Sequence, residues 1–208
     1  MISNERIKEA DRNVKQYIDD GLFRIKDESI KKFTDFFMRN AESSLQTAAL
    51  LYQISEEKMT KDVLKIGAGF ESYLWVIVCS YYSMFYAATA LLAKEGMKAR
   101  GEMVHKVTAD ALIHFYISNK KLAKFQLQDY DEAKDVAGEL VGREELMKRI
   151  EKKAGELIVA YEAERKKRSQ FQYDTGLMTK KGYANTSLDR AKRFVGEISK
   201  ILKSGSGS

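Results

Sequence analysis

The sequence predicts an all-α fold, a helical bundle arranged around one long hydrophobic helix with a helical extension at the N-terminus. Its 208 residues contain no proline, so the strongest helix breaker is absent from the whole chain. The run Ser72–Ala93 spans 22 residues without a charged side chain, whereas its flanks are rich in Lys, Glu, Asp and Arg. No run of alternating β-branched residues bounded by turns predicts a strand. We therefore expect one mostly helical domain.

The charge-free run is long enough either to span a membrane or to form the central helix of a helical domain. Its hydroxyl groups favour the second alternative, because a helix inside a protein can pair each of them with a neighbour. We expect a central helix over about residues 70–95 that ends at Gly96, and no membrane contact. The hydroxyl-bearing residues are Ser72, Tyr73, Ser80, Tyr81, Tyr82, Ser83, Tyr86 and Thr89.

Helices separated by turns are predicted before this run. Gly21 is placed to stop the first helix, Asp27 to cap the second and Ser55 to cap a short third one. The Gly-Ala-Gly at residues 67–69 predicts a turn and is not a nucleotide-binding fingerprint, since no strand precedes it and the third glycine is missing. These predicted helices cover residues 4–20, 28–54 and 57–66.

The chain after the run also predicts helices, and Asn185, Thr186 and Ser187 offer a cap for the last of them. The predicted helices cover residues 105–118, 129–140, 143–171 and 186–202. The domain organisation we expect is an N-terminal helical extension (1–27), a helical domain (28–203) and a linker-like Ser-Gly tail (204–208).

The single cysteine, Cys79, lies inside the apolar run. It has no partner for an internal disulfide, which fits a reducing compartment, and it is most simply a small core residue. The first residues, MISNERIKEADR, lack the apolar core of a signal peptide. We therefore expect a cytoplasmic protein.

Positive charge is concentrated at the C-terminal end of the chain. The net charge is +6, but the residues from Arg165 onward include 11 basic and 3 acidic ones, a balance of +8, which leaves −2 for the rest. A basic segment on a near-neutral body favours a polyanionic partner such as RNA, DNA or nucleotide phosphates. The alternative is a solvated basic face that binds nothing.

The densest functional pattern lies in residues 165–174, RKKRSQFQYD. The predicted helix over residues 143–171 has an apolar stripe that ends at Tyr161. Arg168 follows Tyr161 by seven residues, so it returns to nearly the same helix face. An arginine that points into a cleft needs an anionic partner, whereas Lys166 and Lys167 should point away. The alternative is an arginine at a fraying helix end, where cations favour the helix dipole.

Tyr173 lies five residues beyond Arg168 and would be about 140° around a continuing helix. A helix end at residues 174–176, Asp-Thr-Gly, would let the chain turn and bring the phenol back. The alternative is a packing residue near the helix end.

Metal chemistry is not expected. His105 and His114, the only histidines, are nine residues apart and face opposite sides of one predicted helix. With one cysteine and no His-Glu-x-x-His motif, the chain offers no recognisable metal site. We expect no cofactor.

The order of these elements resembles the HEPN superfamily, named for a nucleotide-binding domain of higher eukaryotes and prokaryotes. The resemblance covers about residues 28–202 and rests on four features of the sequence. They are YLWVIVCSYYSMFYAATALLAKEG (73–96), His105, ERKKRSQFQYD (164–174) and ANTSLDRAKRF (184–194).

The resemblance implies an all-α bundle that forms a homodimer with a cleft between the protomers. Many members are metal-independent endoribonucleases whose Arg-x4–6-His motifs meet in that cleft, and some are toxins restrained by a nucleotidyltransferase antitoxin. Arg168 matches the motif arginine, and Tyr173 stands near the position of the histidine. A phenol, with a pKa near 10, is a poor general base at neutral pH, although it can orient a phosphate or a 2′-hydroxyl group.

Two functions follow as hypotheses. The first is an RNA endonuclease with Arg168 and Tyr173 as catalytic residues and His105 as a further candidate acid or base. The second is a non-catalytic module that binds RNA, a nucleotide or a nucleotidyltransferase partner, which the missing histidine favours. The residues expected to hold the RNA backbone are Arg165, Lys166 and Lys167.

Overall fold

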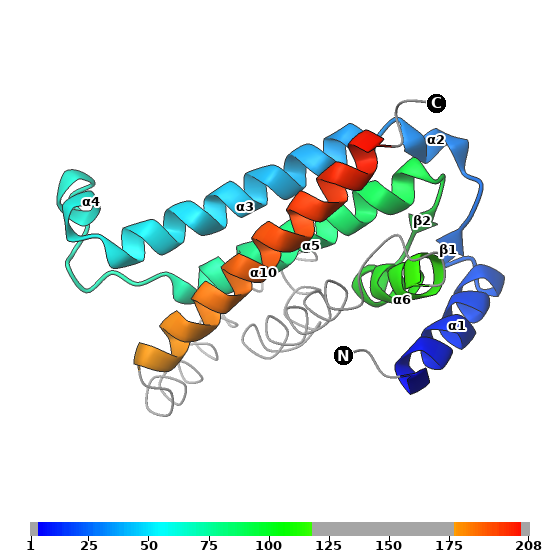
Figure 1. Cartoon of the computed structure of the whole chain (residues 1–208), viewed down its shortest axis with the longest axis horizontal. Helices are drawn as coiled ribbons and strands as arrows, with labels where there is room; N and C mark the ends of the chain where they lie inside the picture. The colour runs from blue at the N-terminus through cyan, green and yellow to red at the C-terminus, as the bar shows by residue number, and fades with distance from the viewer. Residues whose placement is uncertain (1–3, 118–176, 205–208) are drawn as a thin grey trace, which may run out of the picture.

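The computed structural model describes residues 4–117 and 177–204, and these residues form a helical bundle with one very short β-ribbon (Figure 1). The all-α class predicted from the sequence is therefore confirmed. The predicted helices at 129–140 and 143–171 lie outside the described residues. The helices are α1 (Asn4–Asp19), α2 (Glu28–Lys31), α3 (Thr34–Glu56), α4 (Lys58–Val63), α5 (Tyr73–Lys94), α6 (Val104–Ile117) and α10 (Leu177–Ser204), and the strands are β1 (Phe23–Arg24) and β2 (Lys98–Ala99).

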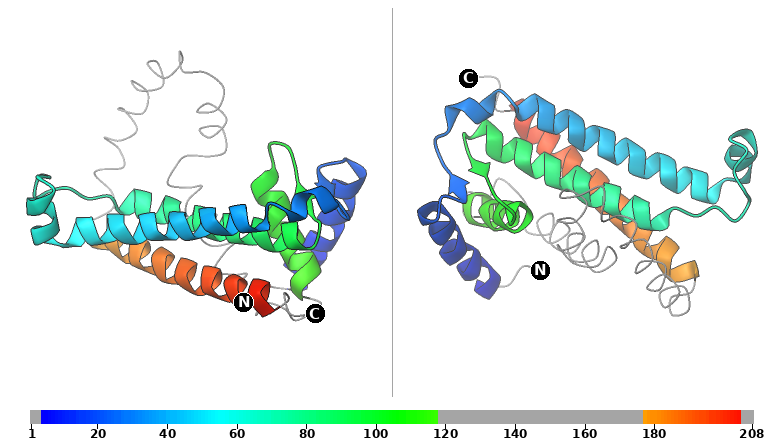
Figure 2. Two further views of the ribbon diagram at one scale, coloured as in Figure 1. Left: turned by 90° about the horizontal axis from the view of Figure 1, so that it is seen from above. Right: turned by 180° about the vertical axis from the view of Figure 1, so that it is seen from behind.

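Helix α5 is the centre of the bundle, as its apolar sequence predicts. It contacts both α3 and α10, which also touch each other, so that three long helices lie side by side (Figures 1 and 2). Fourteen of its 22 residues are buried. Alanines at the contacts let the helix axes approach closely, and larger side chains fill the remaining space. The fully buried alanines of these three helices are Ala41, Ala48, Ala87, Ala88, Ala90, Ala93, Ala184 and Ala191, and the larger residues include Met84, Leu91, Leu92 and Phe194.

Most of the hydroxyl groups described on α5 are paired inside the protein, as expected. Ser72 donates to the Leu51 carbonyl oxygen at 3.0 Å, and Thr89 donates to that of Phe85 at 2.9 Å. Ser80 is an exception, since its buried Oγ has no hydrogen-bond partner among the described residues. By length and composition α5 could cross a membrane, but 72% of its most apolar window is buried in the bundle, so this is weak evidence for a membrane span.

Helices α6 and α1 form a second layer at one end of the long helices. The end of α5 turns through Gly96, which has a positive φ of +71°, and the chain then enters β2 and α6. Helix α1 packs against α6 rather than against α3 (Figure 2). The buried ring of Phe23 stacks on Phe115 of α6 with 5.9 Å between the centroids. The N-terminal extension is thus part of the packed structure.

The single helix predicted over residues 28–54 is wrong in one respect, because it is broken into α2 and α3. The break lies at Lys32 and Phe33, where Thr34 Oγ1 donates to the Lys31 carbonyl oxygen at 2.8 Å. The apolar spacing of Ile30, Phe33 and Phe37 predicts that all three lie on one buried face, but Phe33 is 41% exposed. Asp27 caps α2 as predicted, with its Oδ1 accepting a hydrogen bond from the Ser29 amide at 3.2 Å.

Two cap predictions are wrong. Ser55 lies in the last turn of α3, where it bonds to Ser72 and to the Leu51 carbonyl, and α4 begins after Glu57 instead. The predicted cap at residues 185–187 lies inside α10, which begins at Leu177. Thr186 there donates to the Gly182 carbonyl oxygen at 2.9 Å. The hydroxyl groups of Ser55 and Thr186 each donate to a carbonyl oxygen of the preceding helical turn, which serine and threonine can do at any position inside a helix.

The β-ribbon was not predicted. Strands β1 and β2 are antiparallel, with Phe23 opposite Ala99 and Arg24 opposite Lys98. Two residues are too few to produce a detectable alternation, and the partners are more than 70 positions apart in the chain. The ribbon joins the N-terminal extension to the connection between α5 and α6 (Figure 1).

Candidate functional site

The predicted catalytic residues Arg168 and Tyr173 lie outside the described residues, as do Arg165, Lys166 and Lys167. Their roles therefore stay predictions. The part of the chain that the structure describes contains the helix that follows them, α10, and the remaining candidate, His105.

His105 lies in the first turn of α6, where the sequence predicts a helix start, and the structure shows that it faces α5. Its Nδ1 lies 2.8 Å from the Tyr81 hydroxyl group, and its ring centroid lies 4.2 Å from that of Phe85. Tyr82 meets the imidazole edge to face at 5.8 Å. A phenol bonded to one ring nitrogen fixes the orientation of an imidazole, which is how a general acid or base is held. His105 is half-buried.

His114 faces the opposite side of α6, as the spacing predicts. Its Nδ1 lies 2.6 Å from Asp11 Oδ1 of α1, and both side chains are partly exposed. The two histidines therefore contact different helices. Across residues 4–117 and 177–204 no group of three His, Cys, Asp or Glu side chains is placed to hold a metal ion.

Helix α10 carries a basic outer face. The helix contains seven basic residues and two acidic ones, a net charge of +5. Asp189 is its one exposed acidic residue within the part whose burial is described. The ion pairs within the helix are exposed and loose, such as Lys192–Asp189 at 3.8 Å, and pairs of that kind contribute little to stability. Lys181 is paired closely with Glu56 of α3. The exposed basic residues are Lys181, Lys192, Arg193, Lys200 and Lys203.

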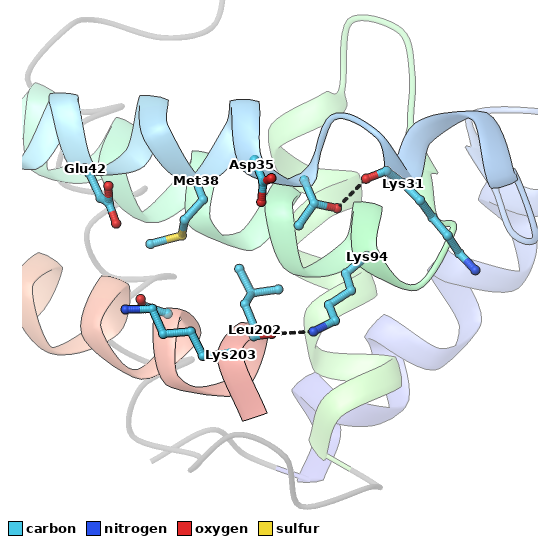
Figure 3. Close-up of a pocket in the computed structure, with 9 residues that line it drawn as sticks. Lys31, Asp35, Met38, Glu42, Lys94, Leu202 and Lys203 are labelled. Atoms are coloured by element: carbon cyan, nitrogen blue, oxygen red, sulfur yellow. Dashed lines mark hydrogen bonds between the residues drawn. The ribbon is translucent and has the colours of Figure 1, made fainter. Parts of the chain in front are cut away.

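The end of α10 helps to form a pocket with α3 and α5, with a volume of about 410 Å³ (Figure 3). Lys31, Lys94 and Lys203 line it together with Asp35 and Glu42. Lys94 donates a hydrogen bond to the carbonyl oxygen of Leu202 at the C-terminal end of α10. A cation there satisfies a carbonyl that the helix leaves unpaired, so this lysine has a structural role.

Asp110 of α6 is a buried charged residue that the sequence reasoning missed. Its side chain is completely buried, and three residues of α1 reach it. Arg6 Nη2 lies 2.7 Å from Oδ1, while Asn13 Nδ2 and the Tyr17 hydroxyl group donate to Oδ2 at 2.9 Å and 3.0 Å. Burial and the Asp110 carboxylate raise the pKa of Tyr17. One charged residue in the otherwise apolar run VTADALIHF was the available signal.

No family model matches the chain, and no curated protein and no solved structure is significantly similar to it. The geometry and the sequence pattern therefore carry the functional argument alone.

Proposed function

We propose that this protein is a HEPN-like, RNA-engaging protein, with metal-independent RNA cleavage as its activity. The observation that carries the proposal is the basic outer face of α10, a helix with a net charge of +5 that follows the predicted site at residues 165–173 in the sequence. A surface of this charge attracts the phosphate backbone without selecting a sequence. The helical architecture supports the same proposal, because the resemblance implies a helical bundle.

Cleavage without a metal needs three contributions. The RNA 2′-hydroxyl group loses its proton and attacks the adjacent phosphorus, and the 5′ oxygen leaves with a proton. Arg168 would stabilise the charged phosphorane, which is the largest contribution when the donor is held in place. Tyr173 would position the phosphate or the 2′-hydroxyl group, and His105, held by Tyr81, is the candidate for proton transfer.

In this proposal the site is completed by a second copy of the chain, with one Arg168 from each protomer. Exposed apolar residues at one end of the bundle support self-association. Trp75 is 60% exposed at the start of α5, and Met59 and Val63 of α4 are 77% and 75% exposed. Helix α4 projects from this end of the molecule (Figure 1).

A second candidate function is a non-catalytic module that binds RNA, a nucleotide or a nucleotidyltransferase partner. It is favoured by one specific observation, the absence of any histidine after His114. Tyr173 stands in place of the histidine, and a phenol, unlike an imidazole, does not exchange its proton readily near neutral pH.

A cleavage assay tests the proposal. Purified protein is incubated with a mixed RNA pool in EDTA, beside Arg168→Ala and the control Arg12→Ala, which removes an exposed arginine from α1. We expect cleavage by the wild type and the control and a loss of about 100-fold or more in Arg168→Ala. Absence of cleavage by all three proteins, with salt-dependent RNA binding retained, would leave the binding module as the function.

A further inference from the structure

The β1–β2 ribbon is a second basic surface that the proposed site does not use. It brings residues 23–26, which precede α3 in the chain, next to residues 97–100, which follow α5. Phe23 is 1% exposed and faces the core, so the residues on the other side of the pleat point outward. Arg24 and Lys98, directly opposite each other, therefore share the outer face.

Like charges directly opposite on two strands repel each other. Arg100 stands two residues beyond Lys98, and its amide donates to the Leu22 carbonyl oxygen at 2.8 Å, so the ladder continues and Arg100 lies on the same face. Lys26 is exposed in the bend that follows β1. Within the described part of the chain, none of these four residues makes an ion pair. Residues 21–33 and 97–101 contain six basic and two acidic side chains, a net charge of +4.

The two acidic residues of the surface are already engaged. Glu28 pairs with Lys31 at 2.8 Å. Asp27 accepts hydrogen bonds from Ser29, which lower its pKa, and nearby Lys98 and Arg100 lower it further. Asp27 is thus the carboxylate near Lys98 and Arg100, and Glu95 and Glu102 flank the second strand in sequence. Among the residues that the structure describes, basic side chains therefore outnumber acidic ones at the ribbon.

Lys26 occupies an unusual backbone conformation. Its φ is +59°, a region that costs an L-residue with a long side chain roughly 1 kcal/mol and that glycine adopts freely. The next residue is held firmly, since the Asp27 amide donates to the Gly96 carbonyl oxygen at 2.8 Å. Backbone strain retained at a charged surface residue is typical of functional positions.

Exposed aromatic rings lie in the segment that follows the ribbon, next to the basic residues Lys31 and Lys32 in the sequence. Phe33 and Phe36, just after α2, are 41% and 49% exposed, and Lys32 Nζ lies 5.2 Å from the centre of the Phe33 ring. Basic residues interleaved with exposed aromatic rings fit single-stranded nucleic acid, whose phosphates bind cations and whose bases stack on rings. The pocket lined by Lys31, Lys94 and Lys203 lies between this region and α10 (Figure 3).

We propose that the β1–β2 ribbon, with Arg24, Lys98, Arg100 and the exposed Lys26, is a binding surface for single-stranded RNA, and that Lys32 and Phe33 of the following segment extend it. RNA as the polyanion rests on the proposed function. The surface is distinct from residues 165–173, and it gives the N-terminal extension a role in holding the substrate. Its contribution is affinity, whereas cleavage depends on Arg168.

The test measures binding of a labelled 2′-O-methyl oligouridylate of about 20 nucleotides to the full chain. The 2′-O-methyl group blocks attack by the 2′ oxygen, so binding is measured whether or not the protein cleaves RNA. The variant Arg24→Gln/Lys98→Gln removes the opposed charges, and the control Arg12→Gln/Lys15→Gln removes two exposed charges from α1. Urea unfolding of each protein is measured in parallel.

We expect the ribbon variant to lose affinity about 25-fold at about 0.1 M salt, with a salt slope smaller by about 1.4, since each single-strand phosphate contact contributes about 0.7. Its unfolding midpoint should be unchanged or higher, because the repulsion is removed. The control should bind within about twofold of the wild type. Equal affinity and equal slope in the ribbon variant would overturn the inference.

Two further measurements separate this inference from the proposed function. Arg168→Ala should keep the ribbon-dependent affinity while losing cleavage; loss of cleavage alone therefore leaves the ribbon proposal in place. Vesicles of anionic phospholipid are the second probe. Binding to vesicles that depends on Arg24 and Lys98, without binding of the oligonucleotide, would overturn RNA as the ligand.

Discussion

The contacts of α5 with α3 and α10 differ in kind from the contact between α1 and α6. The first are apolar and built from alanines and larger residues such as Met84 and Phe194. The second is organised by one buried carboxylate, Asp110, and three polar side chains of α1. Apolar burial is non-directional and grows with area, whereas a buried charge is stable only while all its partners are present. The two layers should therefore fail for different reasons.

The largest effect is expected in the apolar contact. Phe194 of α10 is fully buried, so Phe194→Ala should lower the free energy of unfolding by about 3–5 kcal/mol. Urea denaturation followed by circular dichroism measures this. The neighbouring exposed Lys192 is the control, and Lys192→Ala should stay within about 0.5 kcal/mol of the wild type. Similar losses in both variants would mean that α10 is not held by its apolar face.

Removal of the buried carboxylate should have the next largest effect. Asp110→Ala leaves Arg6, Asn13 and Tyr17 without their shared acceptor, at a cost of about 1–3 kcal/mol. The double variant with Arg6→Ala should lose less than the sum of the two single variants, because the pair acts as a unit. Strict additivity in urea unfolding would contradict the geometry of this contact.

A single hydrogen bond at the same carboxylate should matter less and should depend on pH. Burial and the Asp110 carboxylate raise the pKa of Tyr17 above that of the unfolded chain. The stabilisation is therefore complete below pH about 10 and is lost as the pH rises through the raised pKa. Tyr17→Phe should cost about 0.5–1.5 kcal/mol at neutral pH and show a shallower loss of stability between about pH 10 and 12. If the free energy of unfolding of Tyr17→Phe fell with rising pH as steeply as that of the wild type, the Tyr17–Asp110 hydrogen bond would not be the cause of the raised pKa.

The smallest effect is expected at an exposed polar contact among the three long helices α3, α5 and α10. Glu56 accepts hydrogen bonds from Lys181 and Tyr73, which lower its pKa. Its contribution is present above pH about 4.3 and is lost as the pH falls through the lowered pKa. Glu56→Gln should cost less than about 1 kcal/mol at pH about 7, because the pair is solvated, and should flatten the acid-side loss of stability. Thermal melts at pH about 3 and 7 distinguish the two proteins.

Prediction from sequence succeeded where a long apolar pattern decided the structure. The charge-free run became α5. The spacing in the first helix predicts one apolar face, and of its members Ala10, Val14 and Tyr17 are buried, while Ile7 and Ile18 are half-buried. It failed at helix boundaries, at Phe33 and at residues 185–187. There the local signal is a short polar or aromatic cluster, and packing of the flanking helix decides the outcome.

The candidate sites divide in the same way. His105 was identifiable because histidine is rare in this chain, but its hydrogen bond to Tyr81 joins residues 24 positions apart. Asp110 carried a weak signal, and its partners lie about 100 positions earlier. The ribbon surface carried none, because Arg24 and Lys98 are unremarkable as single basic residues. Pairings of this kind depend on long-range contacts that no local pattern encodes.

The amino-acid sequence by itself determined the helical class, the central position of residues 73–94 and the basic C-terminal third, because periodicity, propensity and net charge are local or additive properties. Only the tertiary structure decided that α1 supplies the partners of Asp110 and that Arg24 stands opposite Lys98. Both pairings form where distant segments of the chain meet. The energetic effect of each charged side chain depends on the groups that the fold places beside it.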